Sequence, residues 1–424
     1  MIKNVKRVTI IIMICTVLAF TLMSCGVDES VQTVQNMVDT EPETGDAKSQ
    51  AGTEQTLTEQ PEETKPENES EMPQEALTET QEASEQTQEA SEQTQEVSEQ
   101  TQVHTPQAVS VTVSATGDCT LGNNQEQSYS GSFNYYYDTY GQDYFFDGVR
   151  DIFASDDFTL INLECVLTDE TEKVEKAWNL KGKPEYAGIM TGSSVEACSL
   201  GNNHTLDYGQ QSLIDTQNVL DEAGIVYGYN DIIGTYTTDE GITIGVVSAN
   251  LLSQNADREE YIKNGIENLK EQGVSLIIAC CHWGIEREYY PNDYQVNTAH
   301  KIIDWGADLL IGNHPHVLQG MELYNGKVIC YSLGNFCFGG NKNPTDKNTA
   351  IYQQTFNFLD GQLQPDINAC IIPCTLSSTQ SANDFQPTVA ENGKKQEIID
   401  LMNTYSQNYS NIGFYEDGKL YVRE

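Results

Sequence analysis

The sequence has few basic residues for its acidic content. Lys and Arg total 22 against 64 Asp and Glu, which gives a formal net charge of −42. Such a chain repels the phosphates of nucleic acids and has no electrostatic attraction for anionic lipid, so we expect no nucleic-acid partner. An acidic chain of this kind suits an anionic cell surface or the handling of cations.

No pair of cysteines has the C-x-x-C spacing, which argues against a structural zinc knuckle. Setting aside the two cysteines before residue 26 leaves nine of the eleven, an odd number for a disulfide framework. Cys198, Cys280, Cys281 and Cys330 lie in or at the ends of apolar runs, where a free thiol behaves as a small hydrophobe. We therefore expect most of the cysteines to be buried and reduced.

Residues 26–108 have almost no aromatic side chains and consist mainly of Glu, Gln, Thr, Ser and Pro. A segment of this composition buries too little apolar area to offset the entropy lost on ordering, so it is predicted to be a disordered acidic tether. A seven-residue unit recurs three times over 82–102, as EASEQTQ, EASEQTQ and EVSEQTQ. With one Ala or Val per unit there is no a/d seam, which excludes a coiled coil.

Residues 1–25 are typical of a lipoprotein-type signal peptide. A basic start precedes an apolar run, 8–23, that is shorter than the ~20 residues of a stable membrane span. The run ends in Leu-Met-Ser-Cys at Cys25, which resembles the bacterial lipobox, where the cysteine is lipidated and becomes the mature N-terminus. An uncleaved signal anchor is the alternative. In both cases we expect an extracytoplasmic protein held at the cell membrane, through a lipid on Cys25 in the first case.

The folded domain is expected over residues 109–424, where apolar runs alternate with helical patterns. Such alternation favours an α/β domain. The predicted strands are 109–115, 158–162, 195–200, 243–248, 274–281, 307–311 and 328–333. The predicted helices are 210–223, 258–272 and 294–305, each followed by a glycine, as helix C-termini commonly are. Later strands at 352–359 and 367–376 are expected to complete a second sheet layer, and a last helix covers 395–405.

Polar and ionisable residues follow six of these apolar runs. In open α/β sheets ligands bind beyond the carboxyl ends of the strands. The residues placed there include Asp118, Glu164, Asn203, His204, Asp207, His282, His314, His316 and Asn335. A lone histidine after a strand is more often structural, but four of the six histidines lie in these loops. The group therefore predicts a metal-type site.

The donor types agree with a divalent metal ion of hard to borderline character, such as Mn, Fe or Zn. They are carboxylates, an amide oxygen and imidazoles, and no thiolate is required. His314 and His316 flank Pro315, which is expected to hold the segment extended. Residues two apart in an extended segment face the same way, so both imidazoles are predicted to point into one site.

Six motifs follow one another along the chain: GDxxLG at 117–122, NLEC at 162–165, GNNHxxDxG at 201–209, HWGxE at 282–286, GNHPHVLQG at 312–320 and YSLGNF at 331–336. This series resembles the bacterial capsule-synthesis, poly-γ-glutamate family (CapA-like), which belongs to the calcineurin-like metallophosphoesterase superfamily. The resemblance covers 111–338 in order. It implies a layered α/β/β/α sandwich with the site at the strand ends.

Carried onto these residues, the resemblance implies two adjacent metal positions bridged by Glu164. The other ligands are Asp118 and His316 at the first position and Asn203, His282 and His314 at the second.

The resemblance also implies a catalytic histidine that is not a metal ligand, which is His204 here. Asp207 either orients that imidazole or caps the following helix. The superfamily's Asp-x-His pair is Asp118-Cys119-Thr120 in this chain, so one histidine ligand is missing. This departure predicts that the first metal position has one ligand fewer than in the superfamily.

The aromatic and acidic residues in and after the HWGxE motif have two readings each. Trp283, Tyr289 and Tyr290 either line a substrate groove or belong to the core. Glu286 and Glu288 either contact a substrate amine or are simply solvated.

Two functions fit these features. The first is a surface-tethered, metal-dependent hydrolase or transferase acting on an anionic capsule polymer or a wall-linked phosphodiester, with His204 as general acid. The second is a non-catalytic accessory protein that binds anionic polymer through a cation and assists its assembly or export, together with membrane-bound polymer synthase components. A solute-binding lipoprotein fits less well, because the sequence has no two-lobed duplication.

Overall fold

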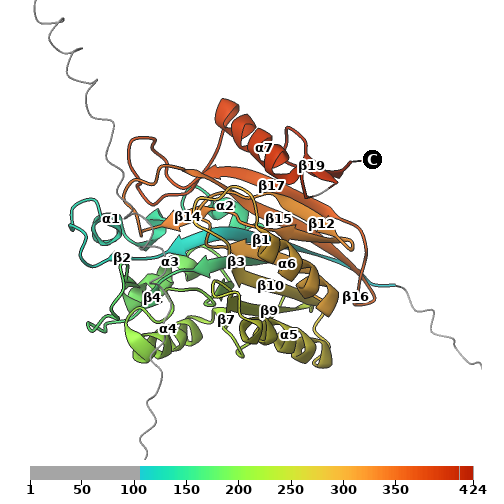
Figure 1. Ribbon diagram of the computed structural model, residues 1–424, viewed down its shortest axis with the longest axis horizontal. Helices are drawn as coiled ribbons and strands as arrows, with labels where there is room; N and C mark the ends of the chain where they lie inside the picture. Colours follow the sequence, from blue (N-terminus) through green and yellow to red (C-terminus); the bar gives the residue numbers. More distant parts are fainter. Residues whose placement is uncertain (1–105, 410, 424) are drawn as a thin grey trace, which may run out of the picture. The chain divides into compact units, whose positions relative to one another are not determined.

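The computed structural model describes residues 106–409 and 411–423, which contain two stacked β-sheets with helices on their outer faces (Figure 1). The predicted signal peptide, Cys25 and nearly all of the predicted tether lie outside the described residues. Within the described ranges, no helix is both long and apolar enough to cross a membrane.

The first sheet has nine strands in the order β18-β17-β15-β1-β3-β6-β7, with β14 beside β1 and β16 beside β15. Their bounds are β1 (Ala108–Thr120), β3 (Phe158–Leu163), β6 (Ala197–Ser199), β7 (Val226–Gly228), β14 (Asn335–Phe338), β15 (Asn348–Leu359), β16 (Gln362–Leu363), β17 (Asn368–Thr375) and β18 (Thr388–Val389). Strands β1, β3, β6 and β7 run parallel, whereas β15 runs antiparallel to β1.

The second sheet has six strands in the order β12-β13-β11-β10-β9-β8. Their bounds are β8 (Gly234–Thr237), β9 (Thr243–Asn250), β10 (Leu276–His282), β11 (Leu309–Asn313), β12 (Met321–Tyr324) and β13 (Lys327–Cys330). The four inner strands are parallel, and the two edge strands are antiparallel to their neighbours. Two small sheets complete the strands: β2 (Asn123–Asn124), β4 (Val166–Leu167) and β5 (Leu180–Gly182), and β19 (Ile412–Phe414) with β20 (Leu420–Val422).

Six of the helices cover the outer faces of the two sheets, and the last helix, α7, packs against β12 and β17 and contributes to the core between the sheets (Figure 1). Their bounds are α1 (Phe133–Tyr140), α2 (Arg150–Phe153), α3 (Ala187–Thr191), α4 (Gly209–Ala223), α5 (Ala256–Glu271), α6 (Asp293–Trp305) and α7 (Asn392–Ser406). Helices α1 to α4 share an apolar cluster with the first sheet, and α5 and α6 share another with the second sheet. A third cluster fills the space between the sheets, which makes this the expected α/β/β/α sandwich.

The strand β10 illustrates why these sequences form buried strands. Leu276 and Ile278 face the core between the sheets, while Ile277 and Ala279 face the layer of α5 and α6. A strand covered on both faces needs apolar side chains at every position, so the run reads as continuously hydrophobic. Cys280 and the other eight described cysteines are free, and all but Cys370 are buried, as predicted.

The late strands differ from the prediction. Strands β15 and β17 do not build a second layer; they extend the first sheet beside β1. The second layer is instead formed by the strands from β8 to β13. Alternation of apolar residues predicts that a segment is a strand, but it does not specify the sheet that the strand joins. The predicted helices match α4 to α7 with small shifts at their ends.

Candidate metal centre

The carboxyl ends of parallel strands from both sheets bring five predicted site residues together. Asp118 lies near the end of β1 and Glu164 directly follows β3, both in the first sheet. His282 ends β10, and His314 and His316 follow β11, in the second sheet. The site therefore spans the two layers. All of these side chains are buried except that of His316, which is partly exposed.

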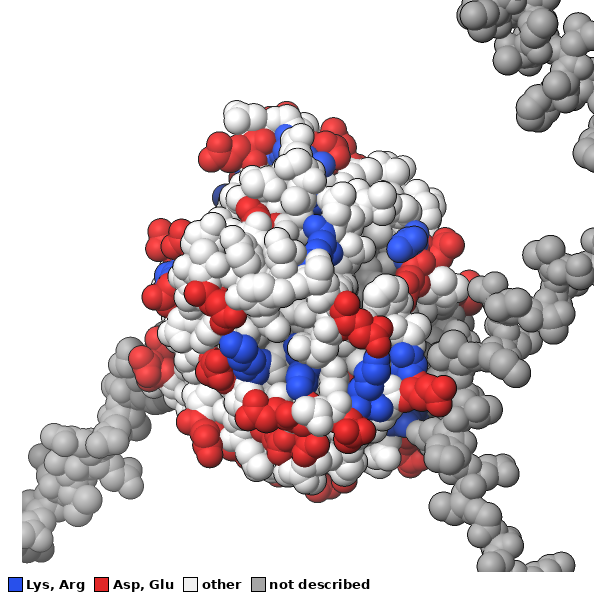
Figure 2. Space-filling model, turned by 90° about the vertical axis from the view of Figure 1, so that its left-hand side faces the viewer, with Lys and Arg blue, Asp and Glu red and all other residues white. Residues whose placement is uncertain are grey.

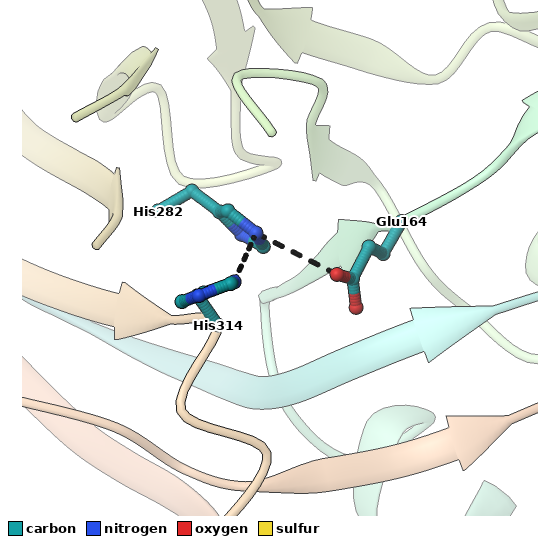
Figure 3. Close-up of side chains that lie close together, drawn as sticks. All are labelled: Glu164, His282 and His314. Carbon is teal, nitrogen blue, oxygen red and sulfur yellow. Dashed lines mark hydrogen bonds and ion pairs between the residues drawn. The ribbon is translucent and has the colours of Figure 1, made fainter. Parts of the chain in front are cut away.

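The carboxylate of Glu164 lies at the centre of the cluster. Both of its oxygens are buried, and no hydrogen-bond donor in the described part of the chain reaches either one. Its Oε1 lies 3.5 Å from Nε2 of His282, 3.9 Å from Nε2 of His316 and 4.0 Å from Nε2 of His204. Figure 3 shows this carboxylate facing His282, which in turn contacts His314. A buried carboxylate without donors is costly unless a cation balances its charge.

Two groups of three side chains have the spacing of metal ligands. One consists of Glu164, His282 and His314, and the other of Asp118, Glu164 and His316; in each, the ligand atoms lie within 4.8 Å of one another. Glu164 belongs to both groups. Oxygen and imidazole donors of this kind suit a divalent ion of hard to borderline character, so the residues fit the metal that the resemblance implies. Their binding of a metal remains a prediction.

Asn203, the remaining predicted ligand, lies beside the first of these groups. Its Oδ1 is 2.9 Å from Nε2 of His282, and the same imidazole nitrogen is 3.2 Å from Nδ1 of His314. The amide oxygen of Asn203 therefore faces the same space as the two imidazoles.

Two asparagines that are not among the predicted metal ligands, Asn162 and Asn335, support those ligands. The Nδ2 of Asn162 donates to Oδ1 of Asp118 at 2.8 Å and lies 3.5 Å from Nδ1 of His282, so it joins the two sheets. The Oδ1 of Asn335 is 2.9 Å from Nδ1 of His316. Such second contacts fix the orientation of metal ligands. Asn162 lies opposite Asp118 in the pairing of β1 with β3, and this register is not visible in the sequence alone.

His204 lies at the edge of the cluster and is oriented by Asp207. The imidazole Nδ1 is 2.7 Å from Oδ2 of Asp207, which is fully buried. Asp207 does not cap α4, whose N-cap residue is Tyr208 and has no side-chain cap. Lys176, which the sequence analysis did not single out, pairs with Asp207 and donates to the backbone carbonyl of Asn203 at 2.8 Å.

The pKa values of the histidines in the cluster are shifted in opposite directions. Burial, together with the neighbouring imidazoles, lowers the pKa of His282 well below its usual value and lowers that of His314 to about 3. Burial alone would also lower the pKa of His316, but the carboxylates of Glu164 and Asp118 outweigh it and raise this pKa to about 10. Burial and the nearby Asp118 raise the pKa of Glu164. The two buried carboxylates thus favour a positive charge at this place.

The expected extended geometry of the His-Pro-His segment is wrong. His314 has φ 96° and His316 has φ 58°, both in the left-handed region that side chains with a Cβ rarely adopt. The backbone turns at each histidine, so the two imidazoles join different groups of the cluster instead of lying side by side on one face of a strand. Backbone strain of this kind is typical of functional sites.

The position of the missing histidine is occupied by Thr120. Its hydroxyl donates to the backbone carbonyl of Glu164 at 3.2 Å, so it holds the loop of that residue and does not face the ligands. The thiol of Cys119 is buried, and burial raises its pKa to about 12. A thiol that keeps its proton is a poor metal ligand, because the thiolate is the binding form.

A groove of about 1460 Å³ opens onto the cluster. His204 and His316 form part of its floor, and Trp178, Glu286, Tyr289 and the loop 340–348 form part of its walls. Tyr289 bridges the two sides by donating to Asp346 at 3.0 Å. In contrast, Trp283 is fully buried and donates to the carbonyl of Tyr331, so it belongs to the core.

Comparisons with known proteins relate this chain to bacterial capsule synthesis proteins. Residues 112–340 match a family described as bacterial capsule synthesis protein PGA_cap. The PGA biosynthesis protein CapA of Bacillus subtilis (strain 168) is 33% identical over 221 residues, which cover 47% of this chain and 57% of that protein. The capsule biosynthesis protein CapA of Bacillus anthracis is 28% identical over 253 residues, which cover 54% of this chain and 60% of that protein. The chain thus spans little more than half the length of these relatives.

A solved structure of a hypothetical protein from Thermus thermophilus is also similar in part. It is 12% identical, with a TM-score of 0.39, and the match covers 62% of this chain and 99% of that protein.

Proposed function

Because this chain belongs to the bacterial capsule synthesis protein family that residues 112–340 match, we propose that it takes part in the biosynthesis of a capsule or poly-γ-glutamate polymer as a surface-anchored protein with a metal-dependent hydrolase site. Two Bacillus relatives are named PGA biosynthesis protein and capsule biosynthesis protein, and these names support the proposal that the polymer is a capsule or poly-γ-glutamate polymer. The proposed substrate is that polymer or a phosphodiester linked to the wall.

One observation carries the hydrolase part of the proposal. Glu164 is buried without a hydrogen-bond donor within the described ranges, and it is shared by two groups of metal-type ligands. A fold keeps a buried carboxylate without hydrogen-bond donors when a bound cation gives it a role, because the buried charge is otherwise destabilising. Asp118, Glu164 and His316 would hold one ion, and Glu164, His282, His314 and Asn203 the other.

The residues around the metal positions then have distinct tasks. A divalent ion held by these residues would polarise the bond under attack and would lower the pKa of water. His204 presents Nε2 toward Glu164, while its Nδ1–H donates to Asp207. Burial lowers the pKa of His204 even though Asp207 opposes this shift, so the imidazole is neutral near pH 7. His204 is therefore placed to accept at Nε2 the proton of an attacking water and to return that proton to the leaving group.

A specific observation favours a second candidate, the accessory protein that binds polymer without turnover. Thr120 replaces the histidine that would complete the position of Asp118 and His316, and its hydroxyl is engaged with the backbone of Glu164. A position short of one ligand binds its ion more weakly, so a bound cation there is better suited to holding an anionic polymer than to chemistry.

Removal of the metal distinguishes these functions. We expect the full chain, loaded with Mn²⁺, Fe²⁺ or Zn²⁺, to hydrolyse a chromogenic phosphodiester or poly-γ-glutamate. Dialysis against a chelator should abolish this activity, and return of the ion should restore it, because the ion supplies the polarisation. Product release is measured before and after dialysis. Turnover that persists in chelated, metal-free protein would contradict the hydrolase proposal.

The surface anchor is tested at Cys25. We propose that this cysteine carries the lipid, because it ends a sequence that resembles a lipobox. Replacement of Cys25 by Ala should leave the protein unlipidated, with its signal peptide retained or miscleaved. Metabolic labelling with a fatty acid measures this, and Cys15→Ala is the matched control. Equal incorporation into wild type and Cys25→Ala would instead favour an uncleaved signal anchor.

A further inference from the structure

The groove beside the metal centre is lined by four Lys and Arg side chains, of which three are already engaged. Lys342 and Lys347 each donate to backbone carbonyls of neighbouring loops, and Lys394 pairs with Glu397 at 2.8 Å. The fourth is Arg287, which is exposed. In the part of the chain that the structure describes, its guanidinium has neither a hydrogen-bond nor an ion-pair partner. Arg287 is therefore the basic group of the groove that remains available to a ligand.

The backbone of Arg287 is fixed to the segment that carries the two histidines. Its φ is 65°, in the left-handed region, and its N–H donates to the carbonyl of Pro315 at 2.8 Å. Pro315 stands between His314 and His316 in sequence, so the loop of Arg287 and the histidine segment are held in register. Strained backbone conformations persist where the surrounding structure fixes them, and they cluster at ligand sites.

Two buried glutamines hold the same loop from its other side. The Nε2 of Gln319 donates to the carbonyl of Glu288 at 2.8 Å, and its Oε1 accepts from Nε2 of Gln295 at 2.9 Å. Both glutamines are at most 1% exposed, and Gln295 belongs to the capping box that starts α6. The loop is thus fixed at both residues 287 and 288, which reduces the entropy that Arg287 loses when it holds a ligand.

The charges around the centre create a need for such a group. Asp118 and Glu164 are buried beside the floor of the groove, and Glu286 lines its wall. Without bound ions all three carboxylates repel an anionic substrate, and with ions bound the carboxylate of Glu286, which belongs to neither ligand group, still does. On the face drawn in Figure 2, Lys and Arg side chains are interspersed with Asp and Glu, so that face presents no broad surface of one charge. An anionic group that lies away from the metal positions therefore depends on an individual cationic side chain of the groove.

From these observations we propose that Arg287 binds an anionic group of the substrate, a carboxylate or a phosphate, at the mouth of the metal centre. The inference rests on the function proposed for that centre and specifies the chemistry of its ligand. A guanidinium presents parallel N–H donors that match both oxygens of a carboxylate or phosphate, which an ammonium does not do. Arg287 thereby positions the substrate over His204 and His316, which line the same groove.

The test is direct binding of two probes, a γ-linked glutamate oligomer and inorganic phosphate, measured by calorimetry with the full chain. Arg287→Asn removes the charge and keeps the loop, because Asn tolerates the left-handed region. It should weaken binding by about 10–100-fold, the effect of losing a charged hydrogen bond. Arg287→Lys should fall between this variant and the wild type. The control is Lys263→Ala on α5, which removes one charge outside the groove and should change nothing.

The two probes identify the source of the anion. An Arg287-dependent loss for the oligomer assigns the group to the carboxylates of the polymer, and a loss for phosphate assigns it to a phosphodiester. Equal binding of both probes by wild type and Arg287→Asn, or no binding of either by wild type, overturns the proposal. Metal content and hydrolysis are measured on the same samples. Arg287-dependent binding without turnover would contradict the hydrolase function while leaving the anion site in place.

Discussion

Replacement of Glu164 by Gln is expected to remove bound metal from both positions of the centre at once. Glu164 is the side chain shared by the two groups of ligands, and a neutral amide lacks the charge and most of the metal affinity of a carboxylate. His314→Ala and His316→Ala each affect one group, so they should lower the metal per chain by less. Elemental analysis of the purified proteins after loading with Mn²⁺ or Zn²⁺ measures the bound metal per chain in the wild type and the three variants.

The same substitution should not weaken the fold of the metal-free protein. The carboxylate of Glu164 is fully buried, lacks hydrogen-bond donors in the described structure and lies near the buried carboxylate of Asp118. Removal of its charge relieves this repulsion and the cost of burying the carboxylate, which together outweigh the attraction between Glu164 and protonated His316, so thermal unfolding should occur at the same temperature or a higher one. The control is Glu286→Gln, an exposed groove residue outside both groups, which should keep its metal. Full metal content in Glu164→Gln, or a clear fall in its Tm, would contradict this account of the centre.

Replacement of His204 by Ala should reduce hydrolysis strongly while leaving metal binding intact. His204 belongs to neither ligand group, yet its Nε2 lies 4.0 Å from Glu164 and it lines the groove. Loss of a general acid or base lowers kcat by roughly 10²–10⁴-fold. Asp207→Asn should cause a smaller loss of kcat. The asparagine side chain has the shape of the aspartate and can still contact the imidazole of His204, but it lacks the negative charge. Both variants are assayed for kcat and for metal content.

His300→Ala is the matched control for His204→Ala. His300 lies on α6, pairs with Glu322 at 2.9 Å and does not line the groove, so its loss should leave kcat unchanged. A wild type that binds metal but turns over no substrate, together with a His204→Ala variant that still supports capsule formation, would favour the accessory function. Loss of metal in His204→Ala would instead make this histidine a ligand.

The order of strands and helices was largely predictable from the sequence, because each element carries its own local pattern. Apolar runs predicted β1, β3, β9 and β10, and periodicity with a following glycine predicted α4 and α6. The sheet that the late strands β15 and β17 join was not predictable. Pairing of β15 with β1 joins residues more than two hundred positions apart, such as Val111 and Phe356, and no local pattern encodes that contact.

The candidate site was predictable in composition but not in geometry. Polar residues after the strands identified Asp118, Glu164, His282 and the His-Pro-His segment, because the strands themselves were recognisable. The left-handed backbone at His314 and His316 was missed, since only Gly and Asn signal positive φ in a sequence. Lys176 was also missed: it lies in a loop, and its contact with Asp207 depends on how that loop folds back.

The sequence by itself determined the elements of this protein, the chemical character of its site and its family, because these depend on local pattern and on motifs. The tertiary structure decided three further matters. It divided the strands between two sheets, placed Glu164 where ligands from both sheets meet, and left Arg287 as the Lys or Arg side chain of the groove that has no partner among the described residues. Each of these depends on long-range packing of the strands and loops, in which side chains far apart in sequence share one space, and no local pattern specifies such contacts.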